Sequence, residues 1–114
     1  MTKTIRSLLA LAVVVSLAAA VGFAQSSGEA VYKAKCQMCH GAAGVPSPGM
    51  AKMGVKPIHD RAIMSLSAEQ MQSAVKNGKG KMKPVAGLSE AQIKSAVTYY
   101  RGLHMLNPQP LPPG

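Results

Sequence analysis

Both cysteines of this 114-residue chain lie in one five-residue run, Cys36-Gln37-Met38-Cys39-His40. Two thiols three residues apart, followed at once by a histidine, form the pattern of a c-type haem attachment site. On a helical turn this spacing places both sulfur atoms on one side, within reach of the two vinyl groups on one edge of a porphyrin. His40 is then the candidate proximal ligand of the iron. The run predicts one haem c, bound covalently through Cys36 and Cys39.

Three other interpretations of this run explain it less completely. A redox-active Cys-x-x-Cys pair belongs to a βαβ setting, and no strand-like alternation is visible in the sequence. A structural zinc ion needs four Cys or His ligands, whereas the run supplies three and no paired ligand motif follows it. A disulfide suits an oxidising compartment, but it does not explain the histidine that directly follows the second cysteine.

The first 24 residues have the layout of a secretory signal peptide. Lys3 and Arg6 give a positive start, residues 8–21 are apolar, and small residues precede the expected cleavage after Ala24. The open alternative is an uncleaved membrane anchor, because a spanning helix needs about 20 apolar residues and this stretch nearly reaches that length. The small residues favour cleavage, so we expect export to the periplasm.

Cleavage leaves one small domain, residues 25–106, with a proline-rich flexible tail over residues 107–114. A domain of this size buries little of its own surface and is marginally stable without help. The chain has no tryptophan, and its only phenylalanine leaves with the signal peptide. A haem would supply a large apolar plate on which the helices can pack.

Charge narrows the choice of partners. The chain carries 13 Lys and Arg residues against 4 Asp and Glu, a formal net charge of +9. Cleavage removes two basic residues and no acid, so the mature domain keeps +7. Nucleic acid is the obvious rival partner of such a basic domain, but export and the haem motif argue against it. We expect acidic redox-partner proteins, a membrane oxidase or reductase among them, and a monomeric protein.

The four acidic residues leave few groups for acid–base chemistry. The sequence shows no carboxylate pair, no serine–histidine arrangement and no phosphate-binding loop. We therefore expect neither enzymatic activity nor a small-molecule substrate.

The helical patterns predict an all-α fold of three to four short helices and long loops. A first helix is expected over residues 28–35, directly before the haem run. Ser67 and Ser89 each precede an apolar helical pattern and have a glutamine three residues later, as in a capping box. Residues 41–56 are rich in glycine and proline and are expected to form a loop.

Met82 is the candidate for the second axial position on the iron. It lies in residues 78–84, between the two capped helices, and such a loop can lay a thioether over the far face of a haem without interrupting a helix. Met71 falls on an apolar helix face, where core packing explains it. His59 and His104 are the rivals of Met82 for this position, and both are expected to be ordinary surface residues.

These motifs together resemble a short class I cytochrome c of the bacterial and chloroplast type. The resemblance covers residues 28–103 and rests on the following segments: Cys36–Gly41, Pro48, Gly54–Pro57, the methionine loop and Tyr99–Leu103. It implies a cytochrome c fold wrapped around one covalent haem. It also implies that the terminal helices cross, with a glycine near Gly28 and an aromatic near Tyr99 or Tyr100 at the contact.

The resemblance also bears on the two axial ligands. It implies that the carbonyl group of Pro48 accepts a hydrogen bond from Nδ1 of His40, which would fix the imidazole tautomer. One departure concerns the other ligand. The family has a proline directly after the axial methionine, whereas Lys83 separates Met82 from Pro84.

The expected function is that of an exported monohaem c-type cytochrome that carries single electrons between periplasmic or membrane partners. Four lysines surround the methionine loop and would form a basic rim on one haem edge: Lys76, Lys79, Lys81 and Lys83. Two alternatives remain open at this point. The chain could be a haem subunit of a larger membrane oxidoreductase complex, or a small-molecule sensor or weak peroxidase with an open sixth site.

Overall fold

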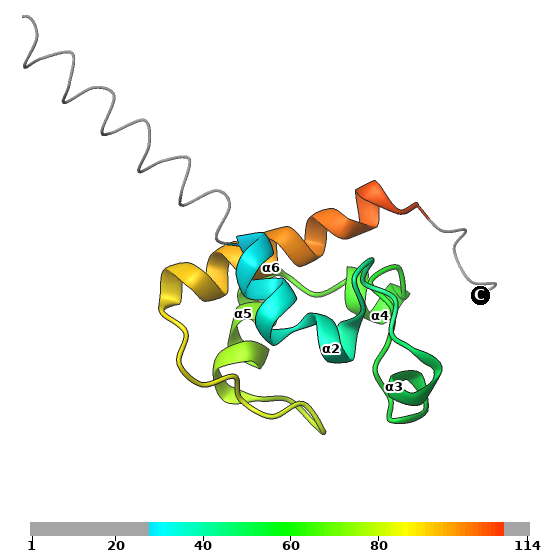
Figure 1. The fold of residues 1–114 in the computed structure, drawn as a ribbon, viewed down its shortest axis with the longest axis horizontal. Coiled ribbons are helices and arrows are strands. Elements are labelled where there is room, and N and C mark those ends of the chain that lie inside the picture. The colour runs from blue at the N-terminus through cyan, green and yellow to red at the C-terminus, as the bar shows by residue number, and fades with distance from the viewer. Residues whose placement is uncertain (1–27, 109–114) are drawn as a thin grey trace, which may run out of the picture.

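The computed structural model describes residues 28–108, which form a bundle of short helices joined by loops (Figure 1). Residues 28–35 are helical, and the later helices follow in this order: α2 (Gln37–His40), α3 (Pro48–Lys52), α4 (Arg61–Met64), α5 (Ala68–Asn77) and α6 (Glu90–Leu106). Backbone pairing of the β type is limited, within this range, to a bridge between Lys79 and Met82. The all-α prediction is confirmed, although the described part contains more helices than the three or four expected.

Two predicted segments fall partly or wholly outside the described residues. The signal peptide, residues 1–24, lies before them, and most of the proline-rich tail lies after them. Both stay predictions. Across residues 28–108, every helix is too short or too polar to cross a bilayer.

Helix α3 lies inside the segment that the sequence predicts to be a loop. Ser47 is its N-cap and accepts a hydrogen bond from the backbone N–H of Met50, and Pro48 occupies the first helical position. Proline is favoured there because its φ angle suits a helix and its missing N–H is not needed. The loop prediction is therefore wrong over α3, because this proline begins a helix instead of interrupting one.

The two predicted capping boxes are both present. The Ser67 hydroxyl accepts from the backbone N–H of Gln70 at 3.1 Å, while the Gln70 side chain accepts from the N–H of Ser67 at 2.8 Å. The Ser89 hydroxyl likewise accepts from the backbone N–H of Gln92 at 3.1 Å, and the Gln92 side chain accepts from the N–H of Ser89 at 2.9 Å. Helices α5 and α6 begin one residue after these serines, as the sequence predicts.

The core between α5 and α6 is built from one apolar stripe on each helix. Met71 and Val75 of α5 are buried against Ile93 and Val97 of α6. Each pair is one helical turn apart, so both side chains of a pair share a face. This confirms that Met71 is a core residue, and it fixes the relative position of the two helices that border the loop of Met82.

The N-terminal helical segment crosses α6 (Figure 1) and packs on it through aromatic rings. The ring of Tyr32 is only 1% exposed and lies 5.3 Å from that of Tyr99 and 5.8 Å from that of Tyr100, centroid to centroid. One turn earlier, Gly28 is so close to α6 that a Cβ atom there would stand 2.5 Å from the carbonyl oxygen of Ser95. The glycine and the aromatic residues thus both lie at the helix crossing, as the resemblance implies.

Candidate haem-binding site

The two cysteines stand one helical turn apart at the end of the N-terminal helical segment. The backbone N–H of Cys36 still bonds to the carbonyl of Tyr32 at 2.9 Å, so the helix runs directly into the motif. The carbonyl of Cys36 then accepts from Cys39 at 3.2 Å and from His40 at 3.0 Å. This is the geometry that the sequence predicts for two thiols serving one porphyrin edge.

Both thiols are free of a disulfide; Cys36 is half-buried and Cys39 is exposed. Burial raises the pKa of the Cys36 thiol above its ordinary value, and the neighbouring Cys39 raises it further. Cys36 is therefore a protonated thiol at neutral pH. The disulfide interpretation has no support in this structure, and two thiols remain for a covalent attachment.

His40 is held as a neutral imidazole. Burial lowers its pKa below the ordinary value, and neutral imidazole is the form that ligates iron. Its ring lies 5.3 Å from the ring of Tyr100 at an interplanar angle of 59°. Burial also raises the pKa of Tyr100 to about 12, so this neighbour is uncharged at neutral pH.

Nδ1 of His40 is buried and has no hydrogen-bond partner within residues 28–108. Pro48, which the resemblance assigns as its acceptor, stands at the first position of α3. The bond between them is therefore not formed in this structure and stays a prediction. A buried, unpartnered nitrogen carries a free-energy cost, so this atom marks a place where the haem-bound protein needs a partner.

The chain turns sharply after His40. Gly41 has a φ of +83°, and a Cβ atom there would lie 1.9 Å from the carbonyl oxygen of Val45, so only glycine fits this turn. The Tyr32 hydroxyl donates a 2.6 Å hydrogen bond to the Gly41 carbonyl. Sequence reasoning missed this function of Tyr32, and its only signal was an aromatic residue four positions before the first cysteine.

Met82 lies in a tight turn between α5 and α6. Its N–H bonds to the carbonyl of Lys79 at 3.0 Å, and the N–H of Lys79 bonds back to the Met82 carbonyl at 2.9 Å. The side chain is partly buried against the α5–α6 core. Farther along, the N–H of Val85 bonds to the carbonyl of Val75 at 2.8 Å and ties the loop to α5. The predicted helix-free loop is present, and ligation by Met82 stays a prediction.

The rivals for the sixth position are also partly buried. His59 lies between α3 and α4, and His104 lies in the last turn of α6. Like His40, each has a buried Nδ1 without a hydrogen-bond partner in the described part of the chain. Neither is the ordinary surface residue that the sequence predicts. The structure therefore leaves both as competitors of Met82.

The residues present fit a covalent haem. Two free thiols and a neutral imidazole form the donor set that a c-type haem requires. The segment after His40 also leaves large apolar side chains uncovered by protein: Val45 is 44% exposed, Met53 54% and Met64 43%. Apolar side chains with this much exposure suit packing against a large apolar group.

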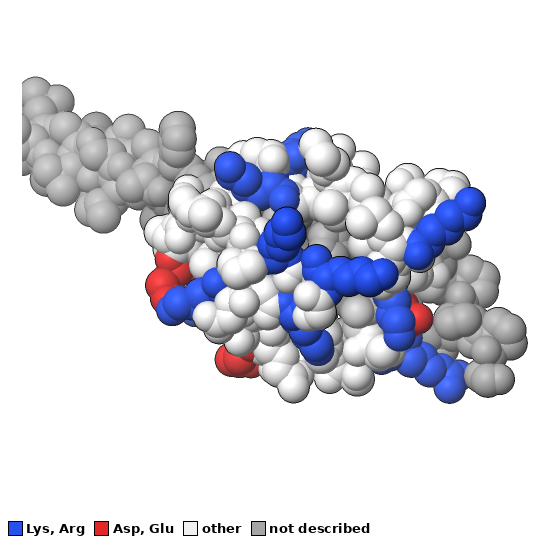
Figure 2. All heavy atoms as spheres, turned by 90° about the horizontal axis from the view of Figure 1, so that it is seen from below, with Lys and Arg blue, Asp and Glu red and all other residues white. Residues whose placement is uncertain are grey.

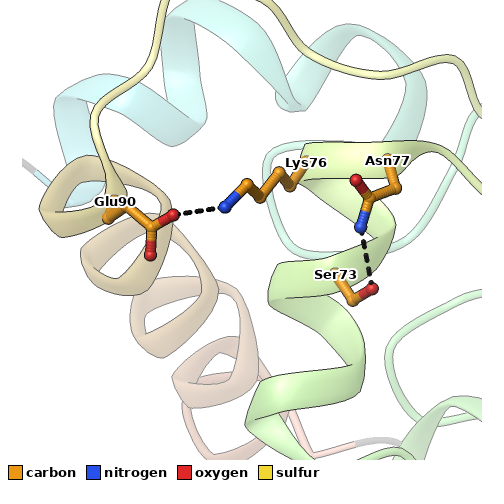
Figure 3. Close-up of polar contacts among 4 residues, drawn as sticks. All are labelled: Ser73, Lys76, Asn77 and Glu90. Atoms are coloured by element: carbon orange, nitrogen blue, oxygen red, sulfur yellow. Dashed lines mark hydrogen bonds and ion pairs between the residues drawn. The ribbon is translucent and has the colours of Figure 1, made fainter.

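The surface around the methionine loop is basic. Figure 2 views the molecule from below, the side on which this loop hangs in Figure 1, and Lys and Arg atoms spread across that face while acidic atoms lie nearer its edges. Lys79, Lys81 and Lys83 are exposed. Lys76 differs from them because it forms an ion pair with Glu90 (Figure 3). Of the four lysines expected at the rim, Lys76 is thus paired with Glu90, and the other three are exposed beside Met82.

Comparison with known proteins agrees with this geometry. The model of the family described as "Cytochrome C oxidase, cbb3-type, subunit III" matches residues 23–99. Among solved structures, the chain is similar to the KustC0563 c-type cytochrome, with a TM-score of 0.60 and 25% sequence identity. That alignment covers 67% of this chain and 95% of the other. No curated protein matches the chain.

Proposed function

Since this chain belongs to the family described as cytochrome c oxidase, cbb3-type, subunit III, we propose that it is an exported monohaem cytochrome carrying single electrons between redox partners. The observation that carries this proposal is the one-turn geometry of Cys36, Cys39 and His40, with free thiols and a neutral imidazole. A covalently held haem suits a small exported protein because it cannot be lost to dilution outside the cytoplasm.

Each residue of the site has a simple task in this proposal. Cys36 and Cys39 would hold the haem through thioethers, and His40 would ligate its iron. Met82, carried by the loop between α5 and α6, would supply a second ligand to the iron. The bound haem supplies a one-electron change between ferrous and ferric iron, at a potential raised by His/Met ligation. The chain itself transforms no substrate, so we class it as a carrier and not as an enzyme.

Partner recognition in this proposal is electrostatic. Lys79, Lys81 and Lys83 flank Met82 and would rim the haem edge if Met82 is axial. A basic rim attracts an acidic redox protein and turns the haem edge toward it. The signal-like residues 1–24 support export to the periplasm. A monomer without a nucleic-acid partner completes the proposal.

The test of the site is the visible spectrum of the protein produced in cells that mature c-type haem. We expect the weak far-red band of His/Met ligation in the oxidised protein and its loss in Met82→Ala. Met105→Ala is the matched control, since Met105 is 82% exposed at the end of α6 and should leave the band intact. Absence of the band, with ready binding of carbon monoxide by the ferrous protein, would make a sensor or weak peroxidase the better proposal.

A second candidate function follows from the name of the family, which is that of a subunit of a cytochrome c oxidase. In that case the chain would be a fixed haem subunit of a membrane oxidoreductase complex. Membranes solubilised in mild detergent distinguish the two proposals. A haem protein that elutes alone supports the carrier, and one that elutes with an oxidoreductase supports the subunit.

A further inference from the structure

We infer that the ion pair between Lys76 and Glu90 is a latch that closes the methionine loop and so positions Met82. This inference rests on the proposed function, because it takes Met82 as an axial ligand. Lys76 and Glu90 are positioning residues in it, since they act on the haem only through the loop that carries Met82.

The latch joins the two ends of the loop. Lys76 lies in the last turn of α5 and Glu90 is the first residue of α6, so the residues between them, 77–89, include all of the loop. Figure 3 shows the Lys76 side chain extending from the end of α5 to the carboxylate of Glu90. A contact between these two positions therefore closes the base of the loop that carries Met82.

The latch works together with other contacts of the same loop. The N–H of Val85 bonds to the Val75 carbonyl at 2.8 Å, which ties the far limb of the loop to α5. The Asn77 side chain donates to the Ser73 hydroxyl at 3.2 Å and braces the last turn of α5 beside Lys76 (Figure 3). The loop is thus fastened at its base and along one limb, which limits how far Met82 can move.

Each charge of the latch also suits the helix end on which it stands. A cation is favoured near the C-terminus of a helix and an anion near the N-terminus, and Lys76 and Glu90 occupy those places. The two side chains are 60% and 81% exposed, so water weakens their attraction. We therefore expect the latch to shift the opening equilibrium of the loop a few-fold, not to decide whether the loop forms.

A latch can be told apart from an effect of net charge. Lys76→Gln removes a positive charge from the basic face, whereas Glu90→Gln removes a negative one. An effect on partner docking or on the overall field would change sign between the two variants. Loosening of the loop would act in the same direction in both, because each variant breaks the same pair.

The experiment measures how easily imidazole replaces the axial methionine in the oxidised holoprotein. Imidazole can bind the iron only when Met82 leaves, so its apparent affinity reports loop opening, and loss of the far-red band gives the readout. We expect Lys76→Gln and Glu90→Gln each to tighten apparent imidazole binding about two- to fivefold, the range of an exposed ion pair. The double variant should show no more than the larger single effect, and exchange of the two charges (Lys76→Glu with Glu90→Lys) should restore part of it.

Two controls match the features of the latch residues. Glu69→Gln removes an acid from the first turn of α5, as Glu90→Gln does in α6, without touching the latch. Glu29→Gln breaks another exposed ion pair, between Glu29 and Lys33, within the N-terminal helical segment. We expect both controls to bind imidazole as the unaltered protein does.

The outcomes separate this inference from the proposed function. If the unaltered protein shows the far-red band and the latch variants bind imidazole unchanged, the latch is overturned and the electron carrier stands. If Lys76→Gln and Glu90→Gln shifted the apparent imidazole affinity in opposite directions, the latch would also be overturned, because the cause would then be the net charge of the protein. If the unaltered protein lacks the band, His/Met ligation fails, and the latch fails with it.

Discussion

The hydroxyl group of Tyr32 donates a 2.6 Å hydrogen bond to the carbonyl oxygen of Gly41. Tyr32 precedes the haem attachment motif and Gly41 follows it, so this bond spans the motif from one end to the other. The same tyrosine ring packs against Tyr99 and Tyr100 of α6. A single buried side chain therefore links the crossing of the terminal helices to the backbone that presents His40.

Tyr32→Phe should destabilise the holoprotein by about 1–3 kcal/mol, because the carbonyl of Gly41 loses its donor in a partly buried setting. Urea unfolding followed by circular dichroism measures this difference. Tyr99→Phe is the control, since its half-exposed ring would keep its packing against Tyr32. Equal midpoints for the two variants would show that the Tyr32 hydrogen bond contributes nothing.

Gly28→Ala tests the helix crossing. The new methyl group would lie 2.5 Å from the backbone oxygen of Ser95, and backbone cannot move aside as a flexible side chain can. We expect a loss of about 1–3 kcal/mol in the free energy of unfolding. Gly102→Ala within α6 has open space around it and should instead stabilise the protein by about 0.5–1 kcal/mol. The same sign for both variants would contradict the packing at the crossing.

Ser89→Ala removes the N-cap of α6 and one half of its capping box. The backbone N–H of Gln92 then loses its acceptor, and we expect a cost of about 1 kcal/mol in the free energy of unfolding. Thr98→Ala, an exposed position inside the same helix, should change it by less than about 0.5 kcal/mol. Thermal unfolding of both variants measures the contrast, and an unaffected midpoint in Ser89→Ala would exclude a stabilising cap.

The latch predicts that the stability of the folded state depends on pH. The hydrogen bond and charge of Lys76 hold the pKa of Glu90 below its ordinary value of 4.5, and Glu90 holds the pKa of Lys76 above its ordinary value of 10.5. The depressed carboxyl pKa stabilises the folded state above pH 4.5, and this contribution disappears as the pH falls through the folded pKa. The raised amine pKa stabilises it below pH 10.5, and that part is lost as the pH rises through the folded pKa.

The measurement is the difference in unfolding free energy between the unaltered protein and Glu90→Gln across pH. We expect it to be constant in the neutral range and to shrink below pH 4.5, where the carboxylate gains its proton. Glu29→Gln serves as the comparison, because it breaks an ion pair outside the loop and its unfolding free energy therefore carries no change in the loop contacts. A difference that grows toward acid pH would contradict the sign of the Glu90 shift.

A further prediction concerns the basic rim. Replacing Lys79, Lys81 and Lys83 together by glutamine should slow electron transfer with an acidic redox protein and flatten its dependence on ionic strength, because salt screens exposed charges. Stopped-flow kinetics with an acidic redox protein of known charge as the probe would measure both. Substituting three lysines elsewhere (Lys33, Lys52 and Lys94) removes the same charge and is the control. If the electron-transfer rate depended equally on ionic strength in the two triple variants, the docking proposal would be wrong.

The helices that the sequence predicts well are those whose signals are local. Ser67 and Ser89 each cap a helix through a glutamine three residues away, so the pairing is written within four consecutive residues. Helix α3 escaped prediction because proline both interrupts helices and begins them, and only the cap formed by Ser47 distinguishes the two. His59 and His104 were expected at the surface, yet the fold buries one nitrogen of each.

The sequence by itself determined the attachment chemistry, the two capped helices and their apolar faces, because each depends on residues within about one or two helical turns of one another. Only the tertiary structure decided that Tyr32 holds Gly41, that Gly28 lies against Ser95, and that Lys76 reaches Glu90. These contacts depend on how helices cross and where a loop begins and ends. Side-chain packing between segments distant in the sequence sets that geometry, and no local pattern encodes it.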